Sequence, residues 1–157
     1  MKRETLFLKL TVILMGIPIL AVCIFALPRI ANEAADYFSA YWVFPVITIM
    51  YVSVIPFFAA LYQAFKLLTL IDKSNAFSEL SVKALKNIKY CAFAISVLYV
   101  ASEPFLYLMA EKDDAPGLIV IGMVIIFASL VIGVFAAVLQ KLLKNAIAIK
   151  SENDLTI

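Results

Sequence analysis

Four long apolar runs separated by short polar connections shape the sequence, at about residues 8–27, 43–66, 90–110 and 118–140. A membrane-spanning helix needs about 20 mostly apolar residues to cross about 30 Å of hydrocarbon, and each run is long enough. The runs do not alternate between polar and apolar positions as the strands of a membrane β-barrel do. A helix also satisfies its own backbone hydrogen bonds, which lipid cannot do. The pattern predicts an all-α membrane protein with a four-transmembrane-helix bundle.

The composition supports the same class. Hydrophobic residues make up 65% of the 157-residue chain, and the mean hydropathy is +1.04. Soluble domains contain about 45–50% apolar residues, and a soluble fold of this length has too little interior to bury the excess. Because the connections are short, we expect residues 1–157 to form a single integral membrane domain.

Basic residues gather in every second connection of this pattern. Of the 13 basic residues, most lie near the N-terminus, in or beside the connector 67–89, or near the C-terminus: Lys2, Arg3, Lys9, Lys66, Lys73, Lys83, Lys86, Lys89, Lys141, Lys144 and Lys150. Only Arg29 and Lys112 lie in the other two connections. Short cytoplasmic loops accumulate Lys and Arg because cations are poorly translocated. We therefore expect the connector and both termini in the cytoplasm.

The connector 67–89 is the longest polar interruption in the chain. The apolar pattern of the second run continues to Ile71, so its helix is expected to extend beyond the membrane before a turn that begins at Asp72. Ser78 is a suitable N-cap for the next helix, with Glu79 in its first turn. Apolar residues then repeat at helical spacing opposite lysines, which predicts a cytoplasmic amphipathic helix that runs directly into the third membrane helix.

Two interpretations of this amphipathic helix remain open. Lysines near a membrane surface are attracted to anionic lipid headgroups by about 1 kcal/mol each. The same region could instead dock a cytoplasmic partner, through Phe77, Ser78, Lys83, Lys86 and Lys89. Direct binding of nucleic acid is not expected, because no recognised reading motif accompanies the lysines.

Glu103 is the most informative single residue, because it lies inside the third apolar run. An ionised carboxylate is costly in hydrocarbon, so this side chain should face the bundle interior and find donors, or stay protonated. Counted at helical rise, it lies at about the depth of Thr48 and Tyr51 in the second run. We expect a polar cluster of Glu103, Tyr99 and Tyr51, with Thr48 or Arg29 as a further partner. The cluster would either lock helices together near the outer interface or serve proton or ligand binding.

The first outer connection, Arg29–Tyr41, carries polar and apolar residues at helical spacing. This spacing predicts a short amphipathic helix at the outer membrane interface. The helix would either seal the outer end of the bundle as a lid or present an outward binding surface. The second outer connection, residues 111–117, is expected to form a solvated acidic turn.

Small residues recur in the fourth run and its continuation. Ser129, Gly133 and Ala137 are four residues apart, and Gly122 lies nearer the outer end. Small residues let helix backbones approach closely in lipid. The stripe is therefore either an intramolecular packing seam or the face of a homo-oligomer. The helix is expected to continue beyond Gln140, and residues 151–157 to form a mobile polar tail.

The chain lacks the residues that common metal and catalytic sites require. It has no histidine, and its two cysteines, Cys23 and Cys91, lie at membrane depths too different for a disulfide. Zinc, haem and copper sites have no obvious ligand set, so no cofactor is expected. There are no paired intramembrane acids and no nucleophile–base pair at plausible spacing, so the chain is not expected to be an enzyme.

The connector from Ile71 to Tyr90 and the segment from Ala137 to Lys144 resemble a bacterial family. This is domain-of-unknown-function family 2975, small four-helix membrane proteins found widely in Firmicutes, and its most recognisable part here is the Phe77-Ser78 segment. The resemblance implies a bacterial cell (plasma) membrane location. Such proteins are often encoded beside a small helix-turn-helix repressor of the Cro type, which implies a cytoplasmic transcriptional regulator as partner. The resemblance implies no catalytic residues.

Two functions are consistent with these features. The first is a regulatory or sensory protein, whose bundle responds to a lipid, a small hydrophobic molecule or a membrane state. Its connector would then hold or release the cytoplasmic partner. The second is a small oligomeric transporter or channel with a polar intramembrane site at Glu103.

Overall fold

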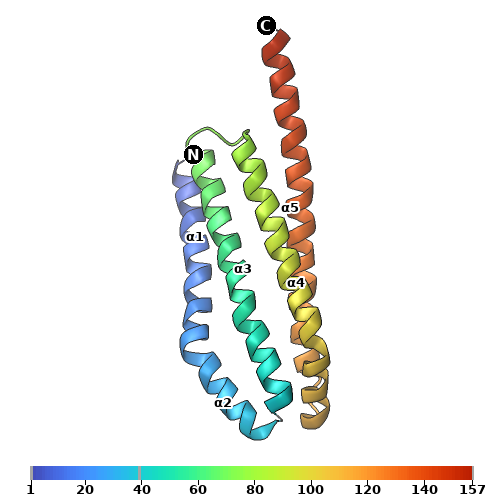
Figure 1. Cartoon of the computed structure of the whole chain (residues 1–157). Helices are drawn as coiled ribbons and strands as arrows, with labels where there is room; N and C mark the ends of the chain where they lie inside the picture. Colours follow the sequence, from blue (N-terminus) through green and yellow to red (C-terminus); the bar gives the residue numbers. More distant parts are fainter. Residues whose placement is uncertain (1, 39, 157) are drawn as a thin grey trace.

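The computed structural model describes residues 2–38 and 40–156, which are almost wholly helical (Figure 1). In chain order the elements are α1 (Lys2–Ala21), the π-helical turn η1 (Val22–Ala26), α2 (Leu27–Tyr37), α3 (Ala40–Asp72), α4 (Glu79–Asp113) and α5 (Gly117–Thr156). Four helical stretches are long and apolar enough to cross a membrane: Arg3–Asp36, Tyr41–Asp72, Glu79–Lys112 and Gly117–Asn153. The predicted all-α architecture with four such stretches is confirmed.

The long helices alternate in direction, so both chain termini lie at the same end of the molecule (Figure 1). We call this the connector end, because the α3–α4 connection lies there too, and we call the opposite end the turn end. Packing follows chain order: α1 and α2 pack on α3, α3 on α4, and α4 on α5. The C-terminal part of α5 projects beyond the other helices at the connector end (Figure 1).

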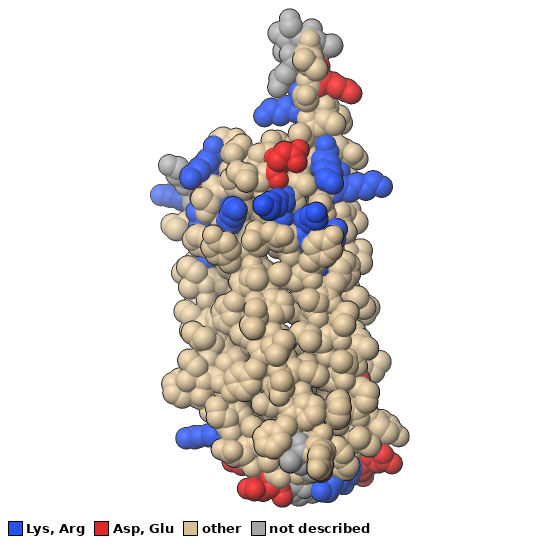
Figure 2. Space-filling model, in the orientation of Figure 1, with Lys and Arg blue, Asp and Glu red and all other residues tan. Residues whose placement is uncertain are grey.

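Charged side chains divide between the two ends. Figure 2 shows Lys and Arg gathered around the connector end, while Asp and Glu are prominent at the turn end. The visible face between the ends is nearly free of charged residues. This uncharged middle band is what a hydrocarbon layer requires of the surface that it contacts.

Local chemistry sets the boundary between α3 and α4. The helix α3 continues to Asp72, as expected, and the chain then turns through Ser74, whose φ of 59° is left-handed. The Ser78 Oγ accepts a hydrogen bond from the Ser81 N–H, so the predicted N-cap is confirmed. The helix α4 then runs without a break from Glu79 to Asp113, so the connector helix and the third membrane helix are one element.

The first membrane stretch bends at η1 before it continues as α2 (Figure 1). The outer helix expected over Arg29–Tyr41 is present as α2, but it begins at Leu27 and ends at Tyr37. Pro28 lies in the first turn of α2, where proline is favoured because the missing N–H would have no helical partner. The helix α2 is therefore a direct continuation of the first long helical stretch and not a separate segment.

The helix α5 extends farther than its sequence suggested. The expected mobile tail from Ser151 is wrong for the residues that the structure describes, because α5 continues to Thr156. No glycine or proline follows Gly133 in the sequence, so the two strongest helix-ending residues are absent from this part of α5.

An apolar cluster closes the turn end. Val43 and Val46 of α3 and Met109 of α4 are buried at its centre. The half-buried residues packed around them are Ala34, Phe38, Trp42, Ile47, Met50, Phe105, Leu106 and Leu118. The cluster therefore joins α2, α3, α4 and the start of α5.

A seam of small and polar residues runs along the face that α5 turns toward α4. Its buried residues are Gly122, Ser129, Gly133, Ala136 and Gln140. A Cβ atom added at Gly133 would stand 2.7 Å from Cε1 of Phe93, and one added at Gly122 would overlap the carboxyl group of Glu103. The two glycines thus leave room for side chains of α4.

The buried residues of the seam differ from the expected four-residue repeat at one position. Ala136 is buried in the seam, whereas Ala137 is only half-buried beside it. Two packed helices meet about every 3.5 residues, so a strict four-residue step leaves the contact face within two turns. The four-residue spacing therefore holds from Ser129 to Gly133 and then shortens to three.

The substitution Gly133→Ala tests this close approach. Overpacking against the Phe93 ring is expected to lower the free energy of unfolding by about 1–3 kcal/mol. Gly117→Ala, on the same helix with nothing within 4 Å of the added Cβ, is the matched control and should change stability by less than about 0.5 kcal/mol. Denaturation in detergent micelles measures both. Equal stability of the two variants would contradict the seam.

Candidate functional site: a cavity between the membrane helices

A partly open cavity of about 500 Å³ lies between α1 and α3 on one side and α4 and α5 on the other. Every long helix and η1 contribute to its lining. Many lining residues are small, and those from α3, α4 and α5 include Ala60, Ala64, Ala92, Ala128 and Ser129. Since no charged residue of the described part of the chain lines it, the cavity is an apolar space with a few neutral polar groups.

Ser53 and Tyr99 form a polar pair at the cavity wall. Ser53 is only 6% exposed, and its Oγ donates a hydrogen bond to the carbonyl oxygen of Met50 over 2.8 Å. The Oγ lies 3.2 Å from the Tyr99 hydroxyl oxygen. A serine hydroxyl has one proton, so Tyr99 is the donor in this second bond. The Tyr99 oxygen consequently retains acceptor capacity.

A second tyrosine stabilises the irregular turn η1. The Leu27 N–H donates to the carbonyl oxygen of Val22, one residue farther back than in an α-helix. Residue 28 is proline and has no N–H, so it cannot continue this pattern to the Cys23 carbonyl. The Tyr51 hydroxyl of α3 donates to that carbonyl oxygen over 3.0 Å. The bond therefore joins η1 to α3 beside the cavity.

The polar cluster expected around Glu103 is not present as predicted. Tyr51 bonds to the Cys23 carbonyl and Tyr99 to Ser53, while the Glu103 carboxyl lies against Gly122 on α5. Within the described residues, the buried Oε1 of Glu103 has no hydrogen-bond partner.

The two remaining members of that cluster, Thr48 and Arg29, are exposed. The expectation failed because α4 packs on two helices at once. Side chains four residues apart on one helix can therefore face different neighbours, as Tyr99 and Glu103 do.

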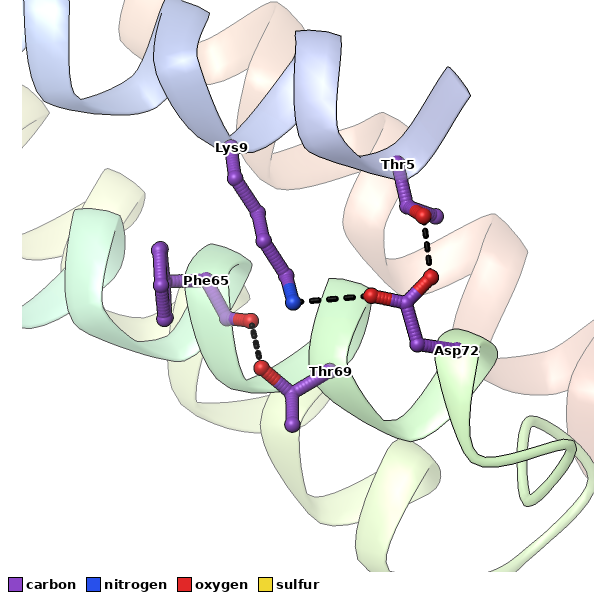
Figure 3. A network of polar contacts seen from close by, with 5 residues as sticks. All are labelled: Thr5, Lys9, Phe65, Thr69 and Asp72. Atoms are coloured by element: carbon purple, nitrogen blue, oxygen red, sulfur yellow. Dashed lines mark hydrogen bonds and ion pairs between the residues drawn. The ribbon is translucent and has the colours of Figure 1, made fainter. Parts of the chain in front are cut away.

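A polar contact that the sequence did not reveal joins α1 to α3 at the connector end (Figure 3). The Lys9 Nζ lies 2.8 Å from Oδ2 of Asp72 and 5.3 Å from the ring centroid of Phe65. The Thr5 hydroxyl donates to the other carboxylate oxygen of Asp72. The side chains of Lys9 and Asp72 are only 19% and 16% exposed. Opposite charges at the edges of two apolar runs were the signal for this pair.

Of the residues expected to dock a partner, Phe77 lines an apolar groove at the connector end. The groove has a volume of about 370 Å³ and is lined by Leu67, Ile71, Ala76, Phe77, Leu85, Leu139, Leu142, Leu143 and Ala146. Phe77 is 55% exposed, and Lys83 and Lys86 are also exposed. Lys89 is half-buried and donates to Oε1 of Gln140 over 3.3 Å. Lys89 therefore contributes to packing of α4 on α5.

Metal ligands are not gathered anywhere in the described part of the chain: no group of three or more Asp, Glu or Cys residues there is placed to hold a metal ion. The two free cysteines are half-buried, Cys23 at the cavity and Cys91 on α4.

Comparison with known proteins places the chain among membrane proteins. The family model described as "Protein of unknown function (DUF2975)" matches residues 29–157. The chain belongs to this family. A relative, the "Uncharacterized membrane protein YoaS" of Bacillus subtilis (strain 168), is 65% identical over 158 residues, which cover 99% of both chains. No solved structure matches this chain. The family resemblance noted in the connector is confirmed.

The bond from Tyr51 to η1 is testable in this DUF2975 protein by Tyr51→Phe. Removal of the donor leaves the Cys23 carbonyl without its partner and should lower the free energy of unfolding by about 1 kcal/mol. Tyr62→Phe removes a hydroxyl from an exposed tyrosine of the same helix and should have almost no effect. Unfolding by denaturant in micelles measures both, and a Tyr51→Phe protein as stable as Tyr62→Phe would contradict this role.

The ion pair between α1 and α3 is testable by a double-mutant cycle on Lys9→Met and Asp72→Asn. Because both groups are mostly shielded from water, the cycle should give a coupling free energy of about 1 kcal/mol or more. A cycle of Lys83→Met with Asp72→Asn is the control, and its coupling should be near zero. The same unfolding assay reports both cycles. Equal coupling in the two would show that the pair contributes nothing specific.

Proposed function

We propose that this chain is a regulatory protein of the bacterial cell membrane, with no enzymatic activity, that holds a cytoplasmic protein at its connector end. In this topology both termini and the connector face the cytoplasm. The concentration of Lys and Arg at that end supports the orientation (Figure 2). The outer side then carries α2 and the acidic turn between α4 and α5.

The observation that carries this proposal is apolar surface beyond the predicted membrane crossing. Phe77 is exposed at the rim of the connector-end groove. Leu142, Ile149 and Leu155 are exposed on α5 past residue 140, and the end of this helix projects beyond the other helices (Figure 1). Exposed apolar patches of this kind mark interaction surfaces, because burying them against a partner removes them from water.

The charges around the groove define the partner's chemistry. The exposed lysines on α4 and α5 nearby are Lys83, Lys86, Lys141, Lys144 and Lys150. An amphipathic helix with an apolar face and acidic flanks complements this surface. The family resemblance suggests that the helix belongs to a small helix-turn-helix regulator. Anionic lipid headgroups would compete for the same lysines.

Binding of the purified regulator to the solubilised chain tests the proposal. Lys83→Gln combined with Lys86→Gln should weaken binding roughly tenfold, because complementary charge at the rim is lost. Leu142→Ser combined with Ile149→Ser should weaken it at least as much, since both remove apolar contact area. Fluorescence anisotropy of the labelled regulator gives the dissociation constants.

Arg29→Gln combined with Lys112→Gln is the matched control, because it removes two positive charges at the turn end. This control should bind the regulator as the unaltered chain does. No binding at all, or equal loss in the control, would reject partner docking. Loss of binding to phosphatidylglycerol vesicles alone would assign the lysines to lipid.

A small oligomeric transporter or channel is the second candidate, and the buried Oε1 of Glu103 favours it. Within the described residues this atom has no hydrogen-bond partner, although it lies in a membrane helix. Intramembrane carboxyl groups commonly serve ion or proton pathways. Flux of protons or small cations into liposomes that falls with Glu103→Gln, but not with Glu111→Gln, would support this function. An absence of flux would reject it.

A further inference from the structure

We infer that the cavity between the membrane helices binds a neutral lipid alcohol, a molecule with a long apolar body and one hydroxyl donor. This inference deepens the sensory part of the proposed function by naming the ligand class. Its test requires no cytoplasmic partner, so the two proposals can fail separately.

The cavity is large enough to hold a small molecule. Packed helices normally fill the space between them, so a partly open space of this size is unusual. At about 500 Å³, this cavity lies within the range of small-molecule binding sites. An engineered apolar cavity of about 150 Å³ is sufficient to bind benzene. There is therefore room for an alkyl or isoprenoid chain several times the size of benzene.

The lining excludes a charged ligand. No Lys, Arg, Asp or Glu is among the residues that line the cavity, and most of the surface comes from aliphatic and aromatic side chains. Burial of an unpaired charge in such surroundings is strongly unfavourable. A fatty acid anion or a phosphate headgroup does not fit this lining, whereas a neutral molecule does.

The hydrogen-bond directions at the wall select a donor. The single proton of Ser53 is used on the Met50 carbonyl, and the proton of Tyr99 is used on Ser53. What remains at the cavity is acceptor capacity on the Tyr99 oxygen, together with the Ser129 hydroxyl, which also lines the cavity. The Tyr51 hydroxyl is already committed to the Cys23 carbonyl. A ligand hydroxyl can donate to Tyr99, whereas an ether or ketone has no proton to give.

The arrangement of the helices suggests how such a molecule enters. The cavity is lined by α1 and by α5, but α1 packs mainly on α3, and α5 on α4. Extensive packing between α1 and α5 is absent from the described residues. Entry between these two helices allows an alcohol dissolved in the bilayer to reach Tyr99 without crossing the turn-end cluster.

Photo-crosslinking tests the inference on the full-length protein in phosphatidylcholine nanodiscs. The probe is dodecanol with a diazirine on its chain, and mass spectrometry identifies the labelled peptides. Competition uses unlabelled dodecanol, dodecyl methyl ether and dodecane. We expect dodecanol to displace the probe from lining residues at least about threefold better than the ether, as one neutral hydrogen bond allows. Labelling at Val97 and Val100, which are exposed on α4, should not respond to competition.

Two variants assign the effect to the site. Tyr99→Phe keeps the ring but loses the hydroxyl, so it should abolish the preference for alcohol over ether. Tyr107→Phe, on the same helix with an exposed side chain, should keep it. Ala60→Phe fills the cavity from α3 and should reduce labelling of all lining residues, with thermal unfolding as the check that the variant folds.

Equal competition by dodecanol, ether and dodecane would mean that ordinary lipid chains occupy the cavity without recognition of a hydroxyl. Labelling confined to exposed positions such as Val97 would mean that the cavity takes no such molecule. Unchanged preference in Tyr99→Phe would remove the proposed acceptor.

Discussion

Hydrocarbon offers no hydrogen-bond partners, and this constraint governs how the membrane stretches are built. Regular helices satisfy their own backbone hydrogen bonds. At η1 the α-helical hydrogen-bond pattern is interrupted, so a carbonyl group there needs another donor. Leu27 reaches back to Val22, and Pro28 has no proton to offer the Cys23 carbonyl. The hydroxyl of Tyr51 supplies the missing donor from another helix. The irregular turn η1 is thereby coupled to the position of α3.

Small residues have two opposite effects in this bundle. On the seam, Gly133 lets the Phe93 ring of α4 approach the backbone of α5, and the space is filled. Around the cavity, alanines such as Ala60 and Ala92 leave space that is not filled, and α1 packs mainly on α3 and not on α5. Whether a small residue closes or opens the interior thus depends on what the opposite helix presents.

The features that could be predicted from the sequence are those set by neighbours in the chain. The four apolar stretches, the end of α3 at Asp72 and the Ser78 cap depend on local composition and hydrogen bonding within a few residues. The features that could not be predicted depend on which helices meet. The helical spacing on α4 predicted Tyr99 and Glu103 on one face. In the structure Tyr99 contacts Ser53 of α3, whereas Glu103 contacts Gly122 of α5.

The ion pair between Lys9 and Asp72 could not be predicted, because its two residues are far apart in the sequence. Lys9 and Asp72 are 63 residues apart, so each appeared to be an independent surface charge. Their pairing has a consequence for the order of biosynthesis. The first hydrophobic helix leaves the ribosome well before Asp72 is translated. Until then Lys9 can interact only with water and lipid headgroups. Final docking of the first helix must therefore wait until the second has been made, which turns assembly of this half of the bundle into a sequential event.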